Sequence, residues 1–364
     1  MTRFSDLVTK SARRAKSHPE LTPKTSTRLI KLDSNENPFG PSPLALEAMR
    51  AALCSTHCYP ADHCDLLRAR LATLHGVPPE QLLVTPGSTG MLSLLCQSFL
   101  GPGLNAVTSA LSFIVYAMVV RATGARLVET PTRDDGFHLD AIVDAINPET
   151  RLVFLANPNN PTGTMLEAAA IEKFLARIPD HVVVVLDEAY YEFAARFAME
   201  HCLEYSKSTD YVRQGKNIVV LRTFSKVHGL AGLRIGYGMG SAELVASCAR
   251  VANTYSVSSV AQAAALAAIE DQQHIERTLA NNTEQSNILL RELGRLGFHA
   301  IPTSANFVYF DAGEDASSLA ARLLAGSISV RPLAAWGAPR HIRVSIGTPE
   351  QNQIFLEALQ RERR

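Results

Sequence analysis

The chain has 364 residues, of which 46% are hydrophobic and 19% charged, with 35 basic residues against 35 acidic ones. This length allows two domains and a large buried core. The balanced charge gives no electrostatic reason to expect nucleic acid or a membrane as a partner.

The beginning of the chain and the cysteines bear on location. Residues 1–18 carry four basic side chains after position 9 but no apolar run or cleavage site, so we expect an amphipathic arm and no secretion signal. Six cysteines without regular spacing suggest reduced thiols and a cytoplasmic protein. The most apolar stretch, residues 106–120, is interrupted by Thr108, Ser109 and Ser112 and is too short to span a bilayer. We expect a buried helix there.

The first two thirds of the chain alternate between apolar β-rich runs and segments of helical length. Predicted strands lie at residues 81–85, 126–129, 152–156, 182–186 and 218–222. Several are near-continuous Val, Leu and Ile runs, which is typical of strands covered on both faces. Segments 88–99 and 166–178 have helical length, so the order predicts an α/β layered domain with a mostly parallel sheet.

The last third has a different pattern. An Ala-rich helix begins at about residue 252, and a long helix follows through residues 284–296. Short strands are predicted at residues 306–310, 327–330 and 341–345, which indicates a smaller α+β domain. We therefore expect an N-terminal arm (1–34), a large domain (35–250) and a small C-terminal domain (251–364).

The first motif, LLVTPGSTGMLSLL at residues 82–95, reads as a strand, a tight turn and a helix. Gly87, Ser88 and Thr89 would present backbone N–H groups and hydroxyls at a helix N-terminus, which suits a phosphate. A capped turn with no ligand is the alternative.

The second motif is NPNNPTG at residues 157–163, directly after a predicted strand. Its prolines and glycine predict a rigid turn, with a cis bond before one proline among the options. Asn160 would then be a positioned hydrogen-bond donor.

The third motif is DEAY, which begins at Asp187. This carboxylate ends a buried strand, where ligands bind open α/β sheets, and it is costly there unless a cation pairs with it. A helix cap is the alternative reading. Tyr190, three residues on, can share the same site.

The fourth motif is TFSKVHGLAGLRIGYG at residues 223–238, after the last predicted strand of the large domain. Its hydroxyls, Lys226 and an arginine eight residues later suit a phosphate next to an aldehyde. A basic surface loop and a nucleotide site are the alternatives. The glycines at 236, 238 and 240 are weak evidence for a nucleotide, because the strand and acidic residue of a Rossmann site do not follow.

These motifs, together with LDSNENPFGPSP at residues 32–43 and IRVSIGTPEQN at residues 342–352, resemble fold-type I pyridoxal-phosphate (PLP) aminotransferases. Within them the chain is most similar to the histidinol-phosphate aminotransferase family, over nearly its whole length. The resemblance implies the three-layer, aspartate aminotransferase-like fold with a mostly parallel sheet and a smaller α+β C-terminal domain. It also implies transamination of histidinol phosphate with 2-oxoglutarate, in histidine biosynthesis.

The resemblance assigns the catalytic roles to Lys226, Asp187 and Tyr190. Lys226 would form the Schiff base with PLP and move the proton, and Asp187 would keep the pyridine nitrogen protonated. Tyr190 and Asn160 would bond the ring O3′, and Phe113 would stack on the ring where the family usually has tyrosine. The residues implied to hold the cofactor phosphate are Ser88, Thr89, Ser225 and Arg234, with Gly87 shaping the turn and Thr223 assisting.

The same resemblance places a substrate side and a partner subunit. Arg343 matches the arginine that takes the substrate α-carboxylate, and Arg331 one that meets the distal phosphate of histidinol phosphate. Asn35 and Asn306 would line the substrate mouth. Tyr59 corresponds to a tyrosine that reaches the PLP phosphate of the neighbouring subunit, which implies an obligate homodimer.

Departures from the family lie on the substrate side. Residues 17–32 lack the tyrosine of the family's Tyr-x-Pro-Gly arm, and AAWGAP, with the one tryptophan Trp336, replaces Tyr-Gly-Leu-Pro. Amino transfer from aromatic or other amino acids is therefore an alternative. A PLP lyase resembling threonine-phosphate decarboxylase is another. A PLP-binding regulator would need a DNA-binding domain, and no helix-turn-helix fits the short arm.

One cluster has residue types that suit zinc. The segment CSTHCYPADHC holds Cys54, His57, Cys58, His63 and Cys64. The family uses no metal, so we expect none.

Overall fold

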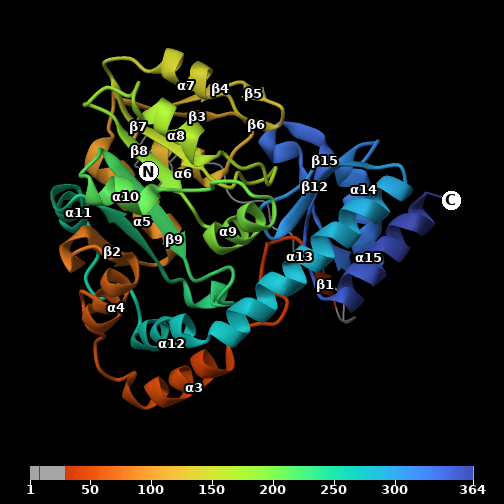
Figure 1. The fold of residues 1–364 in the computed structure, drawn as a ribbon, viewed down its shortest axis with the longest axis horizontal. Helices are drawn as coiled ribbons and strands as arrows, with labels where there is room; N and C mark the ends of the chain where they lie inside the picture. The colour runs from red at the N-terminus through yellow and green to blue at the C-terminus, as the bar shows by residue number, and fades with distance from the viewer. Residues whose placement is uncertain (1–7, 9–28, 364) are drawn as a thin grey trace, which may run out of the picture.

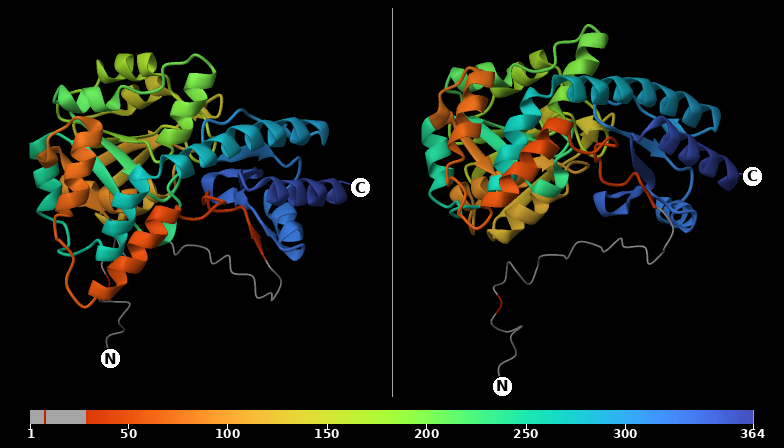
Figure 2. Two further views of the ribbon diagram at one scale, coloured as in Figure 1. Left: turned by 60° about the horizontal axis from the view of Figure 1, so that its bottom comes forward. Right: turned by 90° about the horizontal axis from the view of Figure 1, so that it is seen from below.

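The computed structural model describes residue 8 and residues 29–363. Most of the predicted arm, including most of the stretch without the family's tyrosine, lies outside the described residues. A large and a small domain lie side by side, and α13 (Gln272–Arg295) runs from one out over the other (Figures 1 and 2). Within the described ranges, no helix is long and apolar enough to cross a membrane.

A 7-stranded sheet forms the centre of the large domain, in the order β2-β10-β9-β8-β7-β3-β4. All its strands run parallel except β10. The strands are β2 Leu82–Thr85, β3 Asn105–Ser109, β4 Arg126–Thr130, β7 Thr150–Ala156, β8 Val183–Asp187, β9 Ile218–Thr223 and β10 Gly236–Gly240. The carboxyl ends of the parallel strands, together with the beginning of β10, therefore meet at one edge of the sheet.

Helices cover both faces of this sheet and make the three layers (Figure 1). One layer contains α5 and α6, and α7, α8 and α10 lie on the opposite side. The helices of the large domain are α3 Pro43–Ala52, η1 Leu53–Ser55, α4 Asp65–His75, η2 Pro79–Gln81, α5 Gly87–Phe99, α6 Val115–Ala122, α7 Leu139–Ala145, α8 Ala168–Leu175, α9 Tyr191–Glu200, α10 Ser208–Arg213, η3 Ala231–Leu233, α11 Ala242–Ala249 and α12 Ser259–Glu270. A short hairpin, β5 Thr132–Arg133 with β6 Gly136–Phe137, projects toward the small domain.

The small domain is a 4-stranded antiparallel sheet, in the order β11-β12-β15-β14, packed against helices. Its elements are β11 His299–Ala300, β12 Phe307–Asp311, β14 Arg331–Leu333, β15 Ala338–Ser345, η4 Ala334–Trp336, α14 Ala316–Ala325 and α15 Pro349–Glu362. A separate two-stranded parallel sheet pairs β1 (Ile30–Lys31) with β13 (Ile328–Ser329), so β1 lies against the small domain. Leu32 is buried in the same core.

The large-domain core extends past the predicted division at residue 251. The Ala-rich α12 packs against α3, and its buried alanines belong to the core around the central sheet. A separate apolar cluster, which includes Tyr190 and Phe307, joins the domains. We therefore propose that the small domain begins with α13.

The helix predicted over residues 106–120 is wrong. The stretch divides into β3 and, after a turn, α6. Ala106 and Val107 are fully buried between strands, and the Thr108 hydroxyl donates to the Phe154 carbonyl oxygen at 3.0 Å. Thr108 and Ser109 thus donate to carbonyl oxygens of the sheet, and Ser112 donates to Asn159 Oδ1 in the turn after β7 at 3.0 Å.

The glycine string is a strand that sequence patterning missed. In β10 a Cβ at Gly236 would lie 2.6 Å from the Ser88 backbone nitrogen, and one at Gly238 would lie 2.8 Å from the Met91 side chain. These glycines allow α5 to lie directly against the strand. They have a packing role and do not form a nucleotide loop.

Candidate active site

A cavity of about 470 Å³ opens at the carboxyl edge of the central sheet, between the two domains. It brings together most of the site residues that the sequence predicted. Those that line it are Asn35, Ser88, Thr89, Phe113, Asn160, Asp187, Tyr190, Thr223, Ser225, Lys226, Arg234, Arg331 and Arg343. Gly87 and Asn306 lie behind this lining, and Asn306 donates to the Asn35 carbonyl oxygen at 3.1 Å.

Asp187 lies at the floor of the cavity, at the end of β8, and is 3% exposed. Its Oδ2 accepts a hydrogen bond from the Tyr116 hydroxyl at 3.0 Å. Its Oδ1 is buried and has no hydrogen-bond partner within residues 29–363. Burial raises the pKa of this carboxyl to about 6, and the Tyr116 hydrogen bond opposes part of the rise. The free oxygen is therefore poised for a donor or a cation supplied by a ligand.

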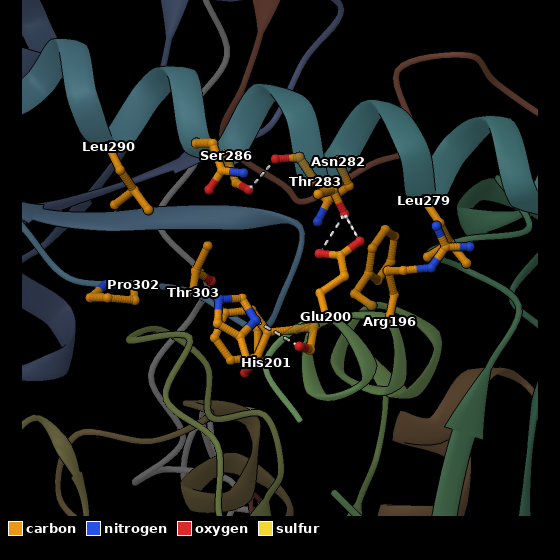
Figure 3. Close-up of a pocket in the computed structure, with 14 residues that line it drawn as sticks. Arg196, Glu200, His201, Leu279, Asn282, Thr283, Ser286, Leu290, Pro302 and Thr303 are labelled. Atoms are coloured by element: carbon orange, nitrogen blue, oxygen red, sulfur yellow. Dashed lines mark hydrogen bonds between the residues drawn. The ribbon is translucent and has the colours of Figure 1, made fainter. Parts of the chain in front are cut away.

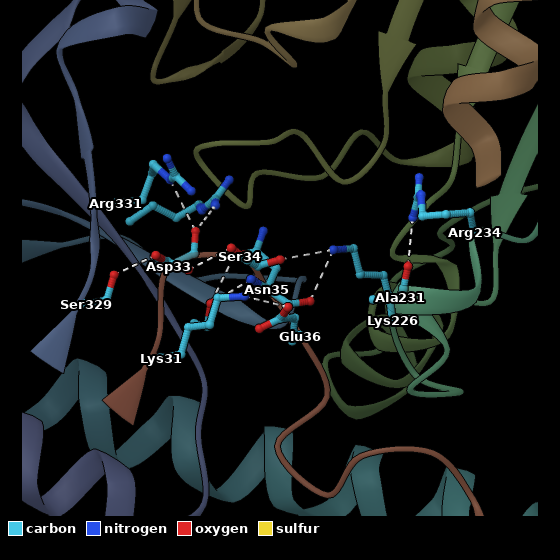
Figure 4. Close-up of polar contacts among 12 residues, drawn as sticks. Lys31, Asp33, Ser34, Asn35, Glu36, Lys226, Ala231, Arg234, Ser329 and Arg331 are labelled. Atoms are coloured by element: carbon cyan, nitrogen blue, oxygen red, sulfur yellow. Dashed lines mark hydrogen bonds and ion pairs between the residues drawn. The ribbon is translucent and has the colours of Figure 1, made fainter. Parts of the chain in front are cut away.

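Lys226 follows β9 and extends into the cavity toward residues 34–35 (Figure 4). Its Nζ donates to the carbonyl oxygens of Ser34 at 3.3 Å and Asn35 at 3.1 Å. Loss of hydration, followed by the charge of Arg343, lowers the pKa of this amine to about 7. A large fraction of the amine is therefore neutral, and nucleophilic, near neutral pH.

The first turn of α5 forms an anion cradle with Arg234. The residue before the helix, Pro86, provides no side-chain cap, so the first backbone N–H groups stay available to a ligand. Gly87 has φ +72°, and a Cβ there would lie 2.7 Å from the Arg234 guanidinium. Arg234 donates to the Ser225 hydroxyl at 3.4 Å and makes no ion pair with any described side chain.

Tyr190 is buried beside Lys226 and forms part of another wall of the cavity. Its hydroxyl accepts hydrogen bonds from the amide nitrogens of Asn35 at 2.9 Å and Asn160 at 3.3 Å. Asn160 comes from the turn after β7, in which the peptide bond before Pro158 is cis. The predicted rigid turn thus holds an amide donor at the cavity.

Arg343 is 5% exposed on β15 and has no carboxylate partner within the described chain. Its guanidinium donates to Asn160 Oδ1 at 2.6 Å and to the Asp33 carbonyl oxygen at 2.7 Å, while Nε is buried without a partner. Burial lowers its pKa to about 10, which leaves it charged at neutral pH. Arg331 lies directly across the strand pair from it. A buried, uncompensated guanidinium fits an incoming carboxylate or phosphate.

The cationic groups are therefore arranged along the cavity. Figure 4 shows Arg234 on one side of Lys226, and Arg331 on the other side beyond the segment around Asn35. No described acidic side chain forms an ion pair with these arginines. The cavity fits one anionic group at each end and a reactive carbonyl near the lysine between them.

Known proteins bear on this arrangement. The family model for aminotransferase class I and II matches residues 27–359. The chain belongs to the aminotransferase class I and II family. Family membership and the geometry agree, because the cavity lies within the matched residues.

Relatives within this family cover nearly the whole chain. A histidinol-phosphate aminotransferase 2 of Ralstonia nicotianae is 42% identical over 92% of this chain and 89% of its own length. A histidinol-phosphate aminotransferase of Moorella thermoacetica is 40% identical over 91% of this chain and 84% of its own. The crystal structure of histidinol-phosphate aminotransferase from Sinorhizobium meliloti with pyridoxal-5′-phosphate has 30% identity and a TM-score of 0.84, covering 92% of this chain and 90% of that one. The fold is therefore that of fold-type I aminotransferases, as predicted.

Tyr59 is the predicted cofactor-binding residue that the single chain leaves outside the cavity. Its side chain is 82% exposed and stacks on Tyr255, with ring centroids 4.6 Å apart. In the neighbouring cysteine and histidine cluster, Cys64 is buried, whereas Cys54 and Cys58 are exposed. Among the described residues no group of three or more His, Cys, Asp or Glu could hold a metal ion.

A second cavity, of about 360 Å³, lies between α9 and α13 (Figure 3). Most of its polar side chains already have partners in the protein. Arg196 pairs with Glu276, the Thr283 hydroxyl donates to Glu200 at 3.1 Å, and the Ser304 hydroxyl donates to the Gly163 carbonyl oxygen at 2.8 Å. None of its lining residues has a buried polar side-chain atom without a partner, in contrast to Asp187 and Arg343 of the first cavity.

Tyr116 is the residue at the site that sequence reasoning missed. It is fully buried, stacks on Phe154 with ring centroids 4.7 Å apart, and orients the Asp187 carboxylate. The local sequence pattern carries no signal for this contact, because Tyr116 and Asp187 are 71 residues apart.

Proposed function

We propose that this chain is a PLP-dependent aminotransferase that transfers the amino group of histidinol phosphate to 2-oxoglutarate. One observation carries this proposal: buried Arg343, with no carboxylate partner among the described residues, faces a cavity whose other end is the α5 anion cradle. The relatives' names mention histidinol phosphate, which carries a phosphate. Its phosphate, and the carboxylates of 2-oxoglutarate as acceptor, suit the Arg343 end of the cavity, while the α5 cradle would hold the phosphate of the cofactor.

The residues fit PLP. Asp187 Oδ1, buried and without a partner in the described chain, suits the protonated pyridine nitrogen. The α5 cradle with Ser88, Thr89, Ser225 and Arg234 would hold the phosphate, and Phe113 would cover the ring. When bound, PLP supplies an electron sink next to the substrate amino group.

Side chains of the protein would hold the cofactor, move the proton and orient the substrate. Lys226, part of whose amine is neutral near pH 7, would hold the cofactor through its aldehyde and would accept and return the proton during amino transfer. Tyr190, held by Asn35 and Asn160, presents a hydroxyl in a fixed orientation for the ring oxygen. Arg343 would orient the substrate anion so that the bond to be broken faces the lysine.

A second subunit completes this proposal. We infer a homodimer in which Tyr59 reaches the cofactor phosphate of the partner, because its ring is exposed on the surface while the rest of the cradle lies in the cavity. We also place the protein in the cytoplasm, since its six cysteines are free thiols.

Aromatic amino acids are the second candidate donor. Phe113 and Trp336 line both the site and an adjoining cavity of about 710 Å³. The buried Trp336 Nε1 has no partner among the described residues. Both rings would offer aromatic contacts to a flat side chain.

The test is a substrate profile of the purified PLP-loaded protein. We expect amino transfer from histidinol phosphate to 2-oxoglutarate to exceed that from phenylalanine or tyrosine in kcat/KM. Faster transfer from phenylalanine would replace the first candidate by the second. Release of CO₂ without an oxo-acid acceptor would show a lyase instead.

A further inference from the structure

We propose that the buried Glu188–Arg222 ion pair is a positioning unit, which fixes the strand ends that carry Asp187 and Lys226. The proposal rests on the proposed function, because it concerns how that site is held together. Neither side chain lines the cavity, so the pair would act through the residues next to it.

The pair is enclosed, and both carboxylate oxygens of Glu188 accept hydrogen bonds. The side chains of Arg222 and Glu188 are 6% and 1% exposed. Arg222 donates to Glu188 Oε2 through Nη2 at 2.9 Å and Nε at 3.1 Å. The hydroxyl of Ser206 donates to Oε1 at 2.5 Å, and that of Ser208 to Oε2 at 2.9 Å. Such a carboxylate has one well-defined position, because every alternative would leave buried polar groups unpaired.

The pair connects the ends of neighbouring strands directly behind the site. Glu188 follows Asp187, and Arg222 precedes Thr223 by one residue and Lys226 by four. The two ends are also joined by the Glu188 backbone N–H, which donates to the Leu221 carbonyl oxygen at 2.9 Å. Because successive side chains of a strand point to opposite faces, fixing Glu188 and Arg222 behind the sheet fixes their neighbours in front of it.

Further buried contacts connect the ion pair with the part of the site that contains Tyr190 and Asn160. The Arg222 guanidinium lies 3.4 Å from the centre of the Tyr191 ring, and Tyr191 follows Tyr190. Tyr191 contacts the Tyr205 ring, with centroids 5.7 Å apart, and the Tyr205 hydroxyl donates to the Asn157 carbonyl oxygen at the start of the turn that carries Asn160. Thus Asp187, Lys226, Tyr190 and Asn160 each lie a few residues or less from a member of one buried network.

The primary test is Glu188→Gln, which keeps the size of the side chain but removes the charge. Its control is Thr150→Val, at the amino end of β7, where the fully buried hydroxyl donates to Asn105 Oδ1 at 2.9 Å. Both changes disturb buried polar groups of the same sheet, but only Glu188 adjoins the site. The measurements are the melting temperature of each apoprotein, the dissociation constant for PLP, the pH midpoint of the bound cofactor's visible absorption, kcat and KM.

We expect Glu188→Gln to bind PLP more weakly, to shift the pH midpoint and to lower kcat on the order of tenfold to a hundredfold, the cost of a small misplacement of reacting groups. The KM for the amino donor should change less, because Arg343 comes from β15 of the small domain and is held by the Asp33 carbonyl oxygen as well as by Asn160. Thr150→Val should lower the melting temperature and leave the pH midpoint and kcat at the wild-type values. An unchanged pH midpoint and kcat in Glu188→Gln would overturn the proposal.

The double variant Glu188→Gln/Arg222→Gln separates position from charge. If the pair positions the strand ends, the double variant keeps the shifted pH midpoint and the low kcat. Recovery of both to wild-type values would mean that the single variant suffered only from an unpaired charge, and would refute positioning. If Glu188→Gln does not fold, Tyr205→Phe serves instead, since it removes only the hydrogen bond to Asn157, and wild-type values in all measurements would count against the network. The wild-type protein must first bind PLP, so failure of the proposed function is recognised separately.

Discussion

Asp187→Asn tests the electrostatics of the cavity floor. Burial raises the pKa of Asp187 from 3.8 to about 6 in the folded protein without cofactor. About two pH units at roughly 1.4 kcal/mol each make the ionised carboxylate cost about 3 kcal/mol of stability. Because the folded pKa lies above the unfolded one, this cost is absent below 3.8, grows up to about 6 and is complete above it.

Asparagine does not ionise, so the apoprotein variant escapes this cost. The amide N–H groups of the asparagine would lack acceptors, which destabilises the folded variant by roughly 1–2 kcal/mol. We therefore expect the Asp187→Asn apoprotein to be about 1–2 kcal/mol more stable than wild type at about pH 7.5, and no more stable near pH 4. With PLP present the order should reverse, because the wild type gains more from binding the cofactor.

The assay is thermal unfolding of wild type and variant across this pH range, with and without PLP. Thr150→Val serves again as the control, because it changes a buried polar group away from the cavity floor. A melting-temperature difference that stays constant from pH 4 to about pH 7.5 would refute the raised pKa of Asp187. Equal stabilisation of both proteins by PLP would refute the contact with the cofactor.

Three further predictions concern other walls of the site. Lys226→Ala should abolish the visible cofactor absorption and turnover, measured by spectrophotometry and product assay, and unchanged absorption would contradict its role. Arg343→Lys keeps the charge but loses the planar fork, so the KM for 2-oxoglutarate should rise on the order of tenfold with a smaller change in PLP affinity, measured by steady-state kinetics and PLP titration; an unchanged KM would remove Arg343 from substrate binding. Gly236→Ala places a Cβ 2.6 Å from the Ser88 backbone nitrogen, so PLP affinity measured by titration should fall, and wild-type affinity would show that the cradle tolerates the shift.

Much of the site could be predicted because its residues mark strand ends. Asp187 ends an apolar run, Asn160 follows another, and Lys226 follows a third. Parallel strands bring such ends to one edge, and the structure places all these side chains around one cavity. The local sequence pattern and the expected parallel topology were therefore sufficient to predict that these three side chains share one site.

The remainder depends on contacts between distant segments. Nothing near Tyr116 in the sequence indicates that its hydroxyl meets Asp187, which is 71 residues away. The strand β10 forms by pairing with β2 and β9, and its glycines, which admit α5, leave no continuous apolar pattern to detect. The pairing of Arg222 with Glu188 likewise appears only when β8 and β9 lie side by side.

The most direct test of the central claim is a single half-reaction. PLP-loaded protein is mixed with histidinol phosphate and no oxo acid, and the visible absorption and the released product are followed. We predict loss of the absorption with one equivalent of oxo product per chain, and recovery when 2-oxoglutarate is added. No product from histidinol phosphate, with the absorption unchanged, would contradict the account.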